Sequence, residues 1–328
     1  MNVATIERVV SKKQHDNADS LEIVQILGWD VVCKKDEFQV GELVVFINID
    51  SIVEPNTHFQ FLASKNYRIK PIKIRGKISQ GLCLSLKILK DFTNKTNFDE
   101  GEDISEIIKA SHYEKPVPRK MTGKHKGTFP SFLIKTDEHN LRNYPHSLKE
   151  IAEKDIYMTK KMDGCSATYY IKNGNFGVCS RTLELQPDEN IYWSIVKKYD
   201  LAYKLLSAGM DIAIQGEIYG PNIQGNPNGS SSICFAAFNL YQIKGNRYEG
   251  FDKFIDFCSQ YEIPTVPMIY RGSLNHTLQD LIEIANSLKY ENNSPCEGLV
   301  LRTTEPMSSK SMQKNMWSAK VLNENYDM

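Results

Sequence analysis

The sequence has no net charge and no long apolar stretch. Its 40 Lys and Arg residues balance 40 Asp and Glu residues over 328 positions. A neutral chain creates no overall field that attracts a polyanion, so any nucleic-acid surface must be a local patch. No apolar run approaches the roughly 18 residues that cross a bilayer. The sequence therefore excludes a membrane-spanning protein with helical segments.

The seven cysteines show no metal-binding pattern. No C-x-x-C pair occurs, and no histidines cluster at the spacing of zinc ligands. Scattered cysteines of this kind fit reduced thiols in an intracellular compartment. The first five residues also lack the basic and then apolar signature of a secretion signal. We therefore expect a soluble intracellular protein with no membrane partner, in either the cytoplasm or the nucleus.

The length of the chain predicts two domains, since a single core usually stops growing below 328 residues. The first domain reads as short β segments at residues 21–26, 29–33, 42–49 and 72–86, the last broken near Gly81. Four or five short strands in under 100 residues suggest a small barrel. Residues 17–21, 40–44, 50–53 and 75–82 resemble the OB-fold barrels that bind RNA. A barrel without a nucleic-acid role is the alternative.

The middle of the chain has the composition of a connection. Residues 114–126 hold two prolines, one glycine and five Lys or Arg, which favours an extended and solvated segment. An ordinary linker and a basic arm that contacts phosphates both fit this composition. We expect an OB-like nucleic-acid-binding domain over residues 1–102, a linker over 103–126 and a second domain over 127–328.

The second domain alternates strands with amphipathic helices. Apolar residues recur at helical spacing over 251–258, and again over 278–285 after a candidate N-cap at Thr277. Residues 167–171, 211–214, 233–240 and 298–301 read as buried strands. The predicted fold class is α+β, with an N-terminal OB-like β-barrel followed by an α+β domain built on antiparallel sheets.

A K-x-D-G sequence at Lys161, Asp163 and Gly164 is the first candidate for chemistry. Alone it is a weak signal, and a surface turn with a solvated lysine is the ordinary explanation. Further segments follow it in a fixed order: Ser180-Arg181, residues 215–220 with Glu217, residues 235–241 with Phe238, residues 297–302 with Glu297, and Lys320. Such an ordered set would rarely arise by chance.

These segments resemble the motifs of the covalent nucleotidyltransferase superfamily, which comprises DNA ligases, RNA ligases and mRNA capping enzymes. The resemblance covers residues 129–320. DNA ligases and capping enzymes carry an OB domain after the last motif, whereas only residues 321–328 follow Lys320 here. An OB-like module placed before the nucleotidyltransferase domain resembles a family of ATP-dependent RNA ligases that seal RNA 3′-OH ends. This resemblance implies that the partner is RNA or a nicked duplex that contains RNA. We expect the protein to be a monomer.

The resemblance implies roles for individual residues. Lys161 would be the nucleophile that carries AMP from ATP, and Lys320 would bind the α-phosphate. The nucleotide-binding set would be Lys160, Lys161, Arg181, Glu217, Phe238 and Lys320, with Arg181 on the ribose or the 3′-OH end and Phe238 stacked on adenine. Mg²⁺ or Mn²⁺ would be held by Asp163, Glu217 and Glu297. Taken singly, each has an ordinary alternative as a core aromatic, a solvated charge or a surface ion pair.

The chemistry requires a neutral lysine. A lysine with a pKa of about 10.4 is protonated at neutral pH and cannot attack phosphorus, so cationic charge or apolar surface beside it must lower that pKa. A divalent cation would serve, and Mg²⁺ is usually held by few carboxylates together with phosphates. This requirement agrees with the three carboxylates that the resemblance assigns to the metal.

Two positions depart from the family pattern. RNA ligases commonly have a glutamate before the nucleophile, where this chain has Lys160, and many have K-x-K in the last motif, where this chain has Ser318 and Lys320. The first change affects how the adenine edge is recognised or the pKa of the neighbouring lysine, and the second removes one phosphate contact.

Two other functions remain open: a guanylyltransferase that caps RNA, and a non-catalytic RNA-binding protein with an inactive scaffold.

Overall fold

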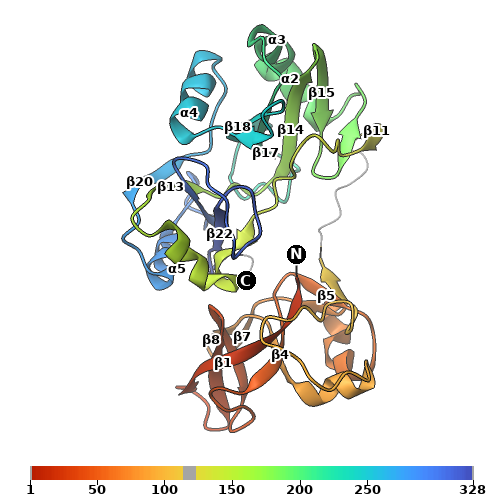
Figure 1. The fold of residues 1–328 in the computed structure, drawn as a ribbon, viewed down its shortest axis with the longest axis vertical. Coiled ribbons are helices and arrows are strands. Elements are labelled where there is room, and N and C mark those ends of the chain that lie inside the picture. The colour runs from red at the N-terminus through yellow and green to blue at the C-terminus, as the bar shows by residue number, and fades with distance from the viewer. Residues whose placement is uncertain (1, 114–122, 327–328) are drawn as a thin grey trace. The chain divides into compact units, whose positions relative to one another are not determined.

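The computed structural model describes residues 2–113 and 123–326. The described residues form two compact units, one of residues 2–113 with 142–145 and the other of 123–141 with 146–326 (Figure 1). Most of the basic part of the expected linker, residues 114–122, lies outside the described residues. Within the described ranges, no helix is both long and apolar enough to cross a membrane.

The first unit is built on a curved antiparallel sheet. Its strand order is β3-β2-β1-β4-β9, with β1 Ala4–Gln14, β2 Leu21–Ile26, β3 Trp29–Lys34, β4 Leu43–Ile47 and β9 Leu82–Ser85. Strand β1 pairs with β4 over its first half and with β2 over its second half. The amide of Gln80, just before β9, donates to the Asp30 carbonyl of β3 at 2.9 Å. The two edges of the sheet therefore approach closure.

Shorter elements complete the first unit. They are β5 Ser51–Val53, η1 Thr57–Lys65, β6 Arg68–Ile69, β7 Ile72–Ile74, β8 Lys77–Ser79, η2 Leu86–Asp91 and β10 Ala110–His112. Strand β10 pairs with β5, and Ile104, Ile108 and Ala110 pack in the same core as Ile6 and Ile47. Residues 103–113, the first part of the expected linker, thus belong to this core.

The second unit contains two larger sheets and four α-helices. The seven-stranded sheet has the order β11-β16-β15-β14-β17-β18-β19, with β11 His125–Thr128, β16 Leu183–Leu185, β15 Asn175–Cys179, β14 Cys165–Lys172, β17 Ile212–Tyr219, β18 Cys234–Gln242 and β19 Arg247–Tyr248. The five-stranded sheet has the order β12-β22-β21-β13-β20, with β12 His139–Asn140, β22 Ser318–Leu322, β21 Gly298–Thr303, β13 Asp155–Lys160 and β20 Met268–Ser273. Only the short β12–β22 pair is parallel among these described strands.

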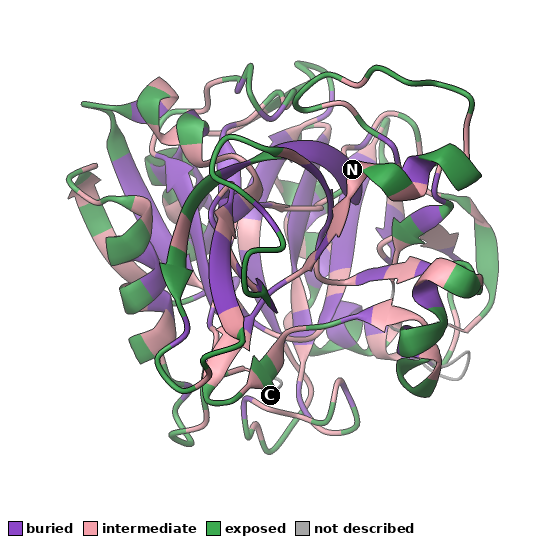
Figure 2. Cartoon of the chain, turned by 90° about the horizontal axis from the view of Figure 1, so that it is seen from below, coloured by how far each residue is buried: buried purple, intermediate pink, exposed green. Residues whose placement is uncertain are grey.

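The helices cover the two sheets with their apolar faces. They are α2 Ile191–Tyr199, α3 Leu201–Ser207, α4 Phe251–Gln260 and α5 Leu278–Ser287. Helices α2, α3 and α4 share one core with β14, β15, β17 and β18. Figure 2 shows that the strands carry most of the buried residues while the helices expose one face. The α+β class and the mainly antiparallel sheets predicted from the sequence are confirmed.

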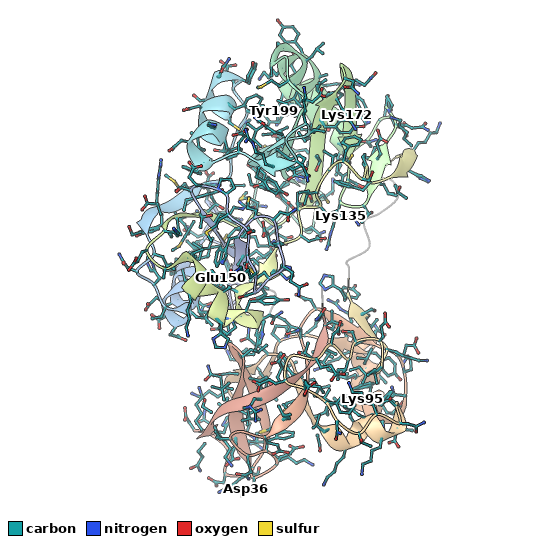
Figure 3. All side chains as sticks on the ribbon, in the orientation of Figure 1. Asp36, Lys95, Lys135, Glu150, Lys172 and Tyr199 are labelled. Carbon is teal, nitrogen blue, oxygen red and sulfur yellow. The ribbon has the colours of Figure 1, made fainter. Side chains whose placement is uncertain are left out.

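Hydrogen bonds from polar side chains stabilise the loops of the second unit. Glu150, in η4 Pro145–Ile151, accepts hydrogen bonds from the Ser309 hydroxyl at 2.6 Å and the Ser311 amide at 2.8 Å. Its place on the unit is labelled in Figure 3. The seven cysteines form no disulfide; six are buried, and Cys234 at the start of β18 is partly exposed.

Candidate active site

The K-x-D-G segment begins where β13 ends. The Lys161 amide donates to the Gly298 carbonyl at 2.9 Å, which joins this segment to the start of β21. Gly164 is required by close packing, since a Cβ at this position would lie 2.1 Å from the Ile218 carbonyl oxygen. The chain therefore turns sharply after Lys161 and enters β14 against β17.

Lys161 and Glu297 form the central ion pair. Lys161 Nζ lies 2.6 Å from Glu297 Oε2, and both side chains are largely shielded from solvent. Burial lowers the pKa of Lys161, but the carboxylates of Glu297, Glu217 and Asp163 raise it more, so the net pKa is well above its ordinary value. The lysine is thus held as an ammonium ion, opposite to the state that attack requires, because carboxylates surround it.

Glu217 adds a second buried carboxylate beside the lysine. It lies on β17 opposite Ser166 of β14. Burial raises the pKa of Glu217, Lys161 lowers it and Glu297 raises it again, to a net value of about 8. The pKa of Glu297 is also raised, first by burial. The site therefore holds more carboxylates than its own cations neutralise, which favours a bound cation.

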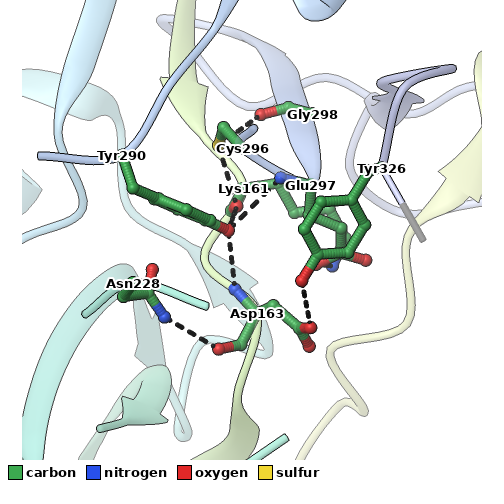
Figure 4. Close-up of polar contacts among 8 residues, drawn as sticks. All are labelled: Lys161, Asp163, Asn228, Tyr290, Cys296, Glu297, Gly298 and Tyr326. Carbon is green, nitrogen blue, oxygen red and sulfur yellow. Dashed lines mark hydrogen bonds and ion pairs between the residues drawn. The ribbon is translucent and has the colours of Figure 1, made fainter. Parts of the chain in front are cut away.

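Asp163 is fixed by three neighbours, drawn in Figure 4. Its amide donates to the Tyr290 hydroxyl at 3.2 Å, and its carbonyl accepts from Asn228 Nδ2 at 3.1 Å. The Tyr326 hydroxyl donates to Asp163 Oδ2. Tyr290 also donates to the Lys161 carbonyl at 2.9 Å, so one hydroxyl joins Lys161 and Asp163, two of the predicted site residues.

Phe238 occupies a β-bulge between β17 and β18. Gln215 is opposite Asn239 and the next residue, Gly216, is opposite Ala237, so Phe238 has no partner in the register. A bulge of this kind re-aims a side chain, and bulges are frequent next to active sites. Phe238 packs with a small core that includes Tyr290, and the Arg302 guanidinium lies 5.5 Å from its ring centre.

The remaining predicted residues lie in different surroundings. Lys320, on β22, is opposite Val300 of β21 and contributes to the electrostatic environment of Glu297. Arg181 forms an ion pair with Asp137 at 2.9 Å. Lys160 points elsewhere: its Nζ donates to the Lys289 carbonyl at 2.7 Å. The structure thus gathers Lys161, Asp163, Glu217 and Glu297 most tightly.

Ser318 has a structural partner. Its hydroxyl accepts a hydrogen bond from Arg302 Nε at 2.9 Å, and Arg302 is only 2% exposed. The same guanidinium donates to Glu138 at 2.8 Å, and Lys314 pairs with the other oxygen of Glu138 at 3.2 Å. A lysine in place of Ser318 would add a third cation to this cluster and would remove the hydrogen bond from Arg302.

Comparison with known proteins identifies the family. A model of the RNA ligase family matches residues 154–321, which contain the Lys161 site. The chain belongs to the RNA ligase family. A model of an OB-fold domain matches residues 3–86 of this ligase, which confirms the predicted N-terminal OB fold. A search of curated protein sequences found no match.

Solved RNA ligases share the fold over the whole chain. A structure of Naegleria gruberi RNA ligase with PPi is 27% identical, has a TM-score of 0.89 and covers 99% of this chain and 98% of its own. A lysine-to-alanine mutant of that protein with ATP and Mn gives the same values. So does a glutamate-to-alanine mutant with AMP and Mn.

The carboxylates of the ligase suit a hard cation held by few protein ligands. Among the residues that the structure describes, no three His, Cys, Asp or Glu side chains gather closely enough to hold a metal ion by themselves. Carboxylate oxygens with an excess of negative charge are nevertheless the donors that Mg²⁺ and Mn²⁺ accept, with water and phosphate completing the coordination. The donor set fits a cation that arrives with phosphates.

Several site residues of the ligase were not predicted from the sequence. Tyr290 and Tyr326 contact the K-x-D-G segment, and Asn228 contacts Asp163. Asp137 and Glu138 lie in the stretch before the first motif that resembles RNA ligases, and that resemblance alone could have drawn attention to them. Tyrosine and asparagine carry no comparable signal because they occur in every core and loop.

Proposed function

We propose that the protein is an ATP-dependent RNA ligase that joins an RNA 3′-OH to a 5′-phosphate through a covalent lysine-AMP intermediate. The 2.6 Å contact between Lys161 Nζ and Glu297 carries this proposal. It puts a largely buried amine among carboxylates at the end of β13, within the matched family region. Naegleria gruberi RNA ligase structures with ATP and Mn, and with AMP and Mn, support the choice of nucleotide and cation.

The first step forms the lysine-AMP bond. Lys161 Nζ loses its proton and attacks the α-phosphorus of ATP; a P–N bond forms, the bond to the bridging oxygen breaks and pyrophosphate leaves. Lys320, which lies on β22 opposite Val300, would stabilise charge on the α-phosphate. A Mg²⁺ or Mn²⁺ ion contacted by Asp163, Glu217 and Glu297, directly or through water, would supply Lewis-acid stabilisation of that phosphate and would favour the neutral amine.

The next two steps transfer AMP and seal the ends. The 5′-phosphate of one strand attacks the α-phosphorus and breaks its bond to Lys161, which gives an adenylylated 5′ end. The RNA 3′-OH then attacks the 5′-phosphorus, AMP leaves and a phosphodiester forms. Phe238 would stack on the adenine in this scheme, and Arg181 would contact the ribose or the 3′-OH end. Lys160, whose Nζ donates to the Lys289 carbonyl, would contribute to the nucleotide site beside Lys161.

The domain roles are part of the same proposal. The OB-fold domain, over residues 1–102, would bind RNA or orient the pyrophosphate. Residues 103–126 would connect it to a nucleotidyltransferase domain over 127–328, although residues 103–113 of this connection pack in the core of the first unit. RNA, including an RNA-containing nicked duplex, would be the substrate, and the enzyme would act as a monomer in RNA repair or nick sealing. The zero net charge of the chain is compatible with RNA binding through a local positive patch.

The decisive experiment is transfer of label from the α-phosphate of ATP or GTP to the protein. We expect label from ATP, with Mg²⁺ or Mn²⁺, to survive denaturing electrophoresis and to disappear in Lys161→Ala. Lys253→Ala, on the exposed side of α4, is the matched control and should label normally. Label from GTP alone would favour capping. If folded protein that is not already adenylated takes up no label from either nucleotide, the ligase function is rejected and only a role in RNA binding remains.

A further inference from the structure

The Tyr290 hydroxyl lies at the meeting point of the nucleophile segment and the segment that carries Glu297. It donates to the Lys161 carbonyl at 2.9 Å, and it accepts from the amides of Asp163 at 3.2 Å and Glu297 at 3.3 Å (Figure 4). One donated and two accepted hydrogen bonds use the full capacity of a hydroxyl group. A single oxygen atom therefore sets the spacing of three backbone groups.

We infer that Tyr290 is the positioning residue of this site, and that its hydroxyl, with the Cys296 thiol, holds the Lys161 backbone in place for attack. This inference rests on the proposed function. Cys296 Sγ contacts the same Lys161 carbonyl at 3.3 Å. Tyr290 itself touches no reacting atom in this scheme, so it acts through the residues that it orients.

The tyrosine is itself rigidly held. It is 5% exposed and packs with Met162 and Cys296. Its amide donates to the Ser294 carbonyl at 2.9 Å and its carbonyl accepts from the Asn293 amide at 3.0 Å, which closes a tight turn. The Ser294 hydroxyl then donates to the Pro227 carbonyl at 2.6 Å. A ring fixed by its core and its turn can hold its hydroxyl in a constant place.

The hydroxyl acts as donor and acceptor at once, since it donates to the Lys161 carbonyl and accepts from the amides of Asp163 and Glu297. Phenylalanine would keep the ring and its packing but would leave two amides without this acceptor and one carbonyl without this donor. Lost contacts to buried backbone groups are costly locally, and a nucleophile displaced by about 1 Å can lose roughly 100-fold in rate.

The test compares Tyr290→Phe with Tyr241→Phe. Tyr241 is the matched control because it is 1% exposed and its hydroxyl bonds Asn246, away from Lys161. Single-turnover label transfer from ATP is measured over a range of ATP concentrations. We expect the maximal rate of Tyr290→Phe to fall about 10- to 100-fold with a nearly unchanged half-saturating ATP concentration, the pattern of an interaction that acts in the transition state. Tyr241→Phe should keep the rate of the unmodified protein.

Hydrogen exchange gives a second readout that does not depend on catalysis. In the nucleotide-free protein, the amides of Asp163 and Glu297 should exchange faster in Tyr290→Phe and not in Tyr241→Phe. A rate loss in Tyr290→Phe no larger than in the control, or unchanged exchange at these amides, would overturn the inference. If Tyr290→Phe does not fold, Cys296→Ala is measured in the same assays. We expect a smaller loss of rate for Cys296→Ala, and an unchanged rate would contradict the inference. Absence of label in the unmodified protein, with exchange as expected, would reject the ligase function while retaining the role of Tyr290.

Discussion

Glu138 is a buried carboxylate whose charge depends on two cations. Burial raises its pKa, but Lys314 and Arg302 lower it more, to about 2. Arg302 is 2% exposed, so its guanidinium has little access to solvent if Glu138 is lost. Removal of one partner from a buried pair typically costs about 3–5 kcal/mol, because the other charge stays buried.

Glu138→Gln should therefore lower stability in a pH-dependent way. A carboxylate with a lowered folded-state pKa contributes stability above its unfolded value of 4.5 and loses this contribution as pH falls toward about 2. The difference in free energy of unfolding between the two proteins should be largest near neutral pH and shrink between pH 4.5 and about 2. Denaturant titrations at several pH values measure it.

Glu283→Gln is the control for this measurement, since Glu283 is exposed on α5. Its free energy of unfolding should match the unmodified protein at every pH. A constant difference for Glu138→Gln across this pH range would contradict the role assigned to the Arg302 and Lys314 charges.

At the scale of elements, helix α5 begins with a capping box. The Asp280 amide donates to the Thr277 hydroxyl at 3.2 Å, and the Thr277 amide donates to the Asp280 carboxylate at 2.8 Å. Each interaction satisfies a backbone donor that the first turn of a helix leaves without an internal partner. Because α5 packs on β21 and β22, its first turn supports the strands that carry the site.

Thr277→Ala should lower the melting temperature. Loss of an N-cap costs about 1 kcal/mol, which corresponds to roughly 2–4 °C for a unit of this size. Thr277→Ser keeps the hydroxyl and should melt near the unmodified protein. Equal melting temperatures for the alanine and serine variants would show that the cap does not stabilise the unit measurably. Differential scanning calorimetry without nucleotide is the measurement.

Elements with strong local signals were predicted well. Strand β2 matches the predicted residues 21–26, and α4 and α5 contain the predicted helical residues 251–258 and 278–285. Strand β1 was not predicted, because its second half carries exposed polar and charged residues and its pairing with β2 and β4 decides its conformation. Helix α2 was also missed, since its tyrosines and β-branched residues have weak helix propensity and tertiary burial outweighs it. Helix α3 was missed because its seven residues are too few to show a helical period.

The site was predictable only where the chain carries a chemical pattern. Lys161, Asp163, Glu217 and Glu297 stand in an ordered set, and the structure brings them together. Tyr290 and Tyr326 reach the K-x-D-G segment from positions more than 120 residues away, so only tertiary pairing reveals them. The bulge that frees Phe238 is likewise a property of register between two strands, which no single segment encodes.

At the scale of the whole molecule, charge is distributed unevenly. Residues 55–90 contain no Asp or Glu and eight Lys or Arg, although the whole chain is neutral. Within this stretch Lys65, Lys70, Lys73 and Arg75 are exposed, and Lys73 and Arg75 lie on the β7–β8 hairpin. Such local positive charge is the electrostatic feature that phosphate binding needs.

The double variant Lys73→Glu, Arg75→Glu should weaken RNA binding. We expect at least about a tenfold loss of affinity near physiological salt, and a plot of log affinity against log salt that is shallower by about one for each lost phosphate contact. Lys34→Glu, Lys35→Glu makes the same charge change on exposed residues beside Asp36 and Glu37 and serves as the control. Equal losses in the two double variants would reject a local RNA surface on the hairpin. Fluorescence anisotropy over a salt series distinguishes these results.

The uneven burial of the cysteines makes the protein convenient for spectroscopy. Six thiols are buried, and burial raises the pKa of thiols such as Cys258 to about 12. Burial also acts on Cys234, but hydrogen bonds from Ser232 and Ser230 and the charge of Lys198 leave its pKa below the ordinary value. A maleimide dye should thus attach first at Cys234, four positions before Phe238 on the same strand. The native chain already contains a single preferred attachment point for a fluorescent reporter next to the site.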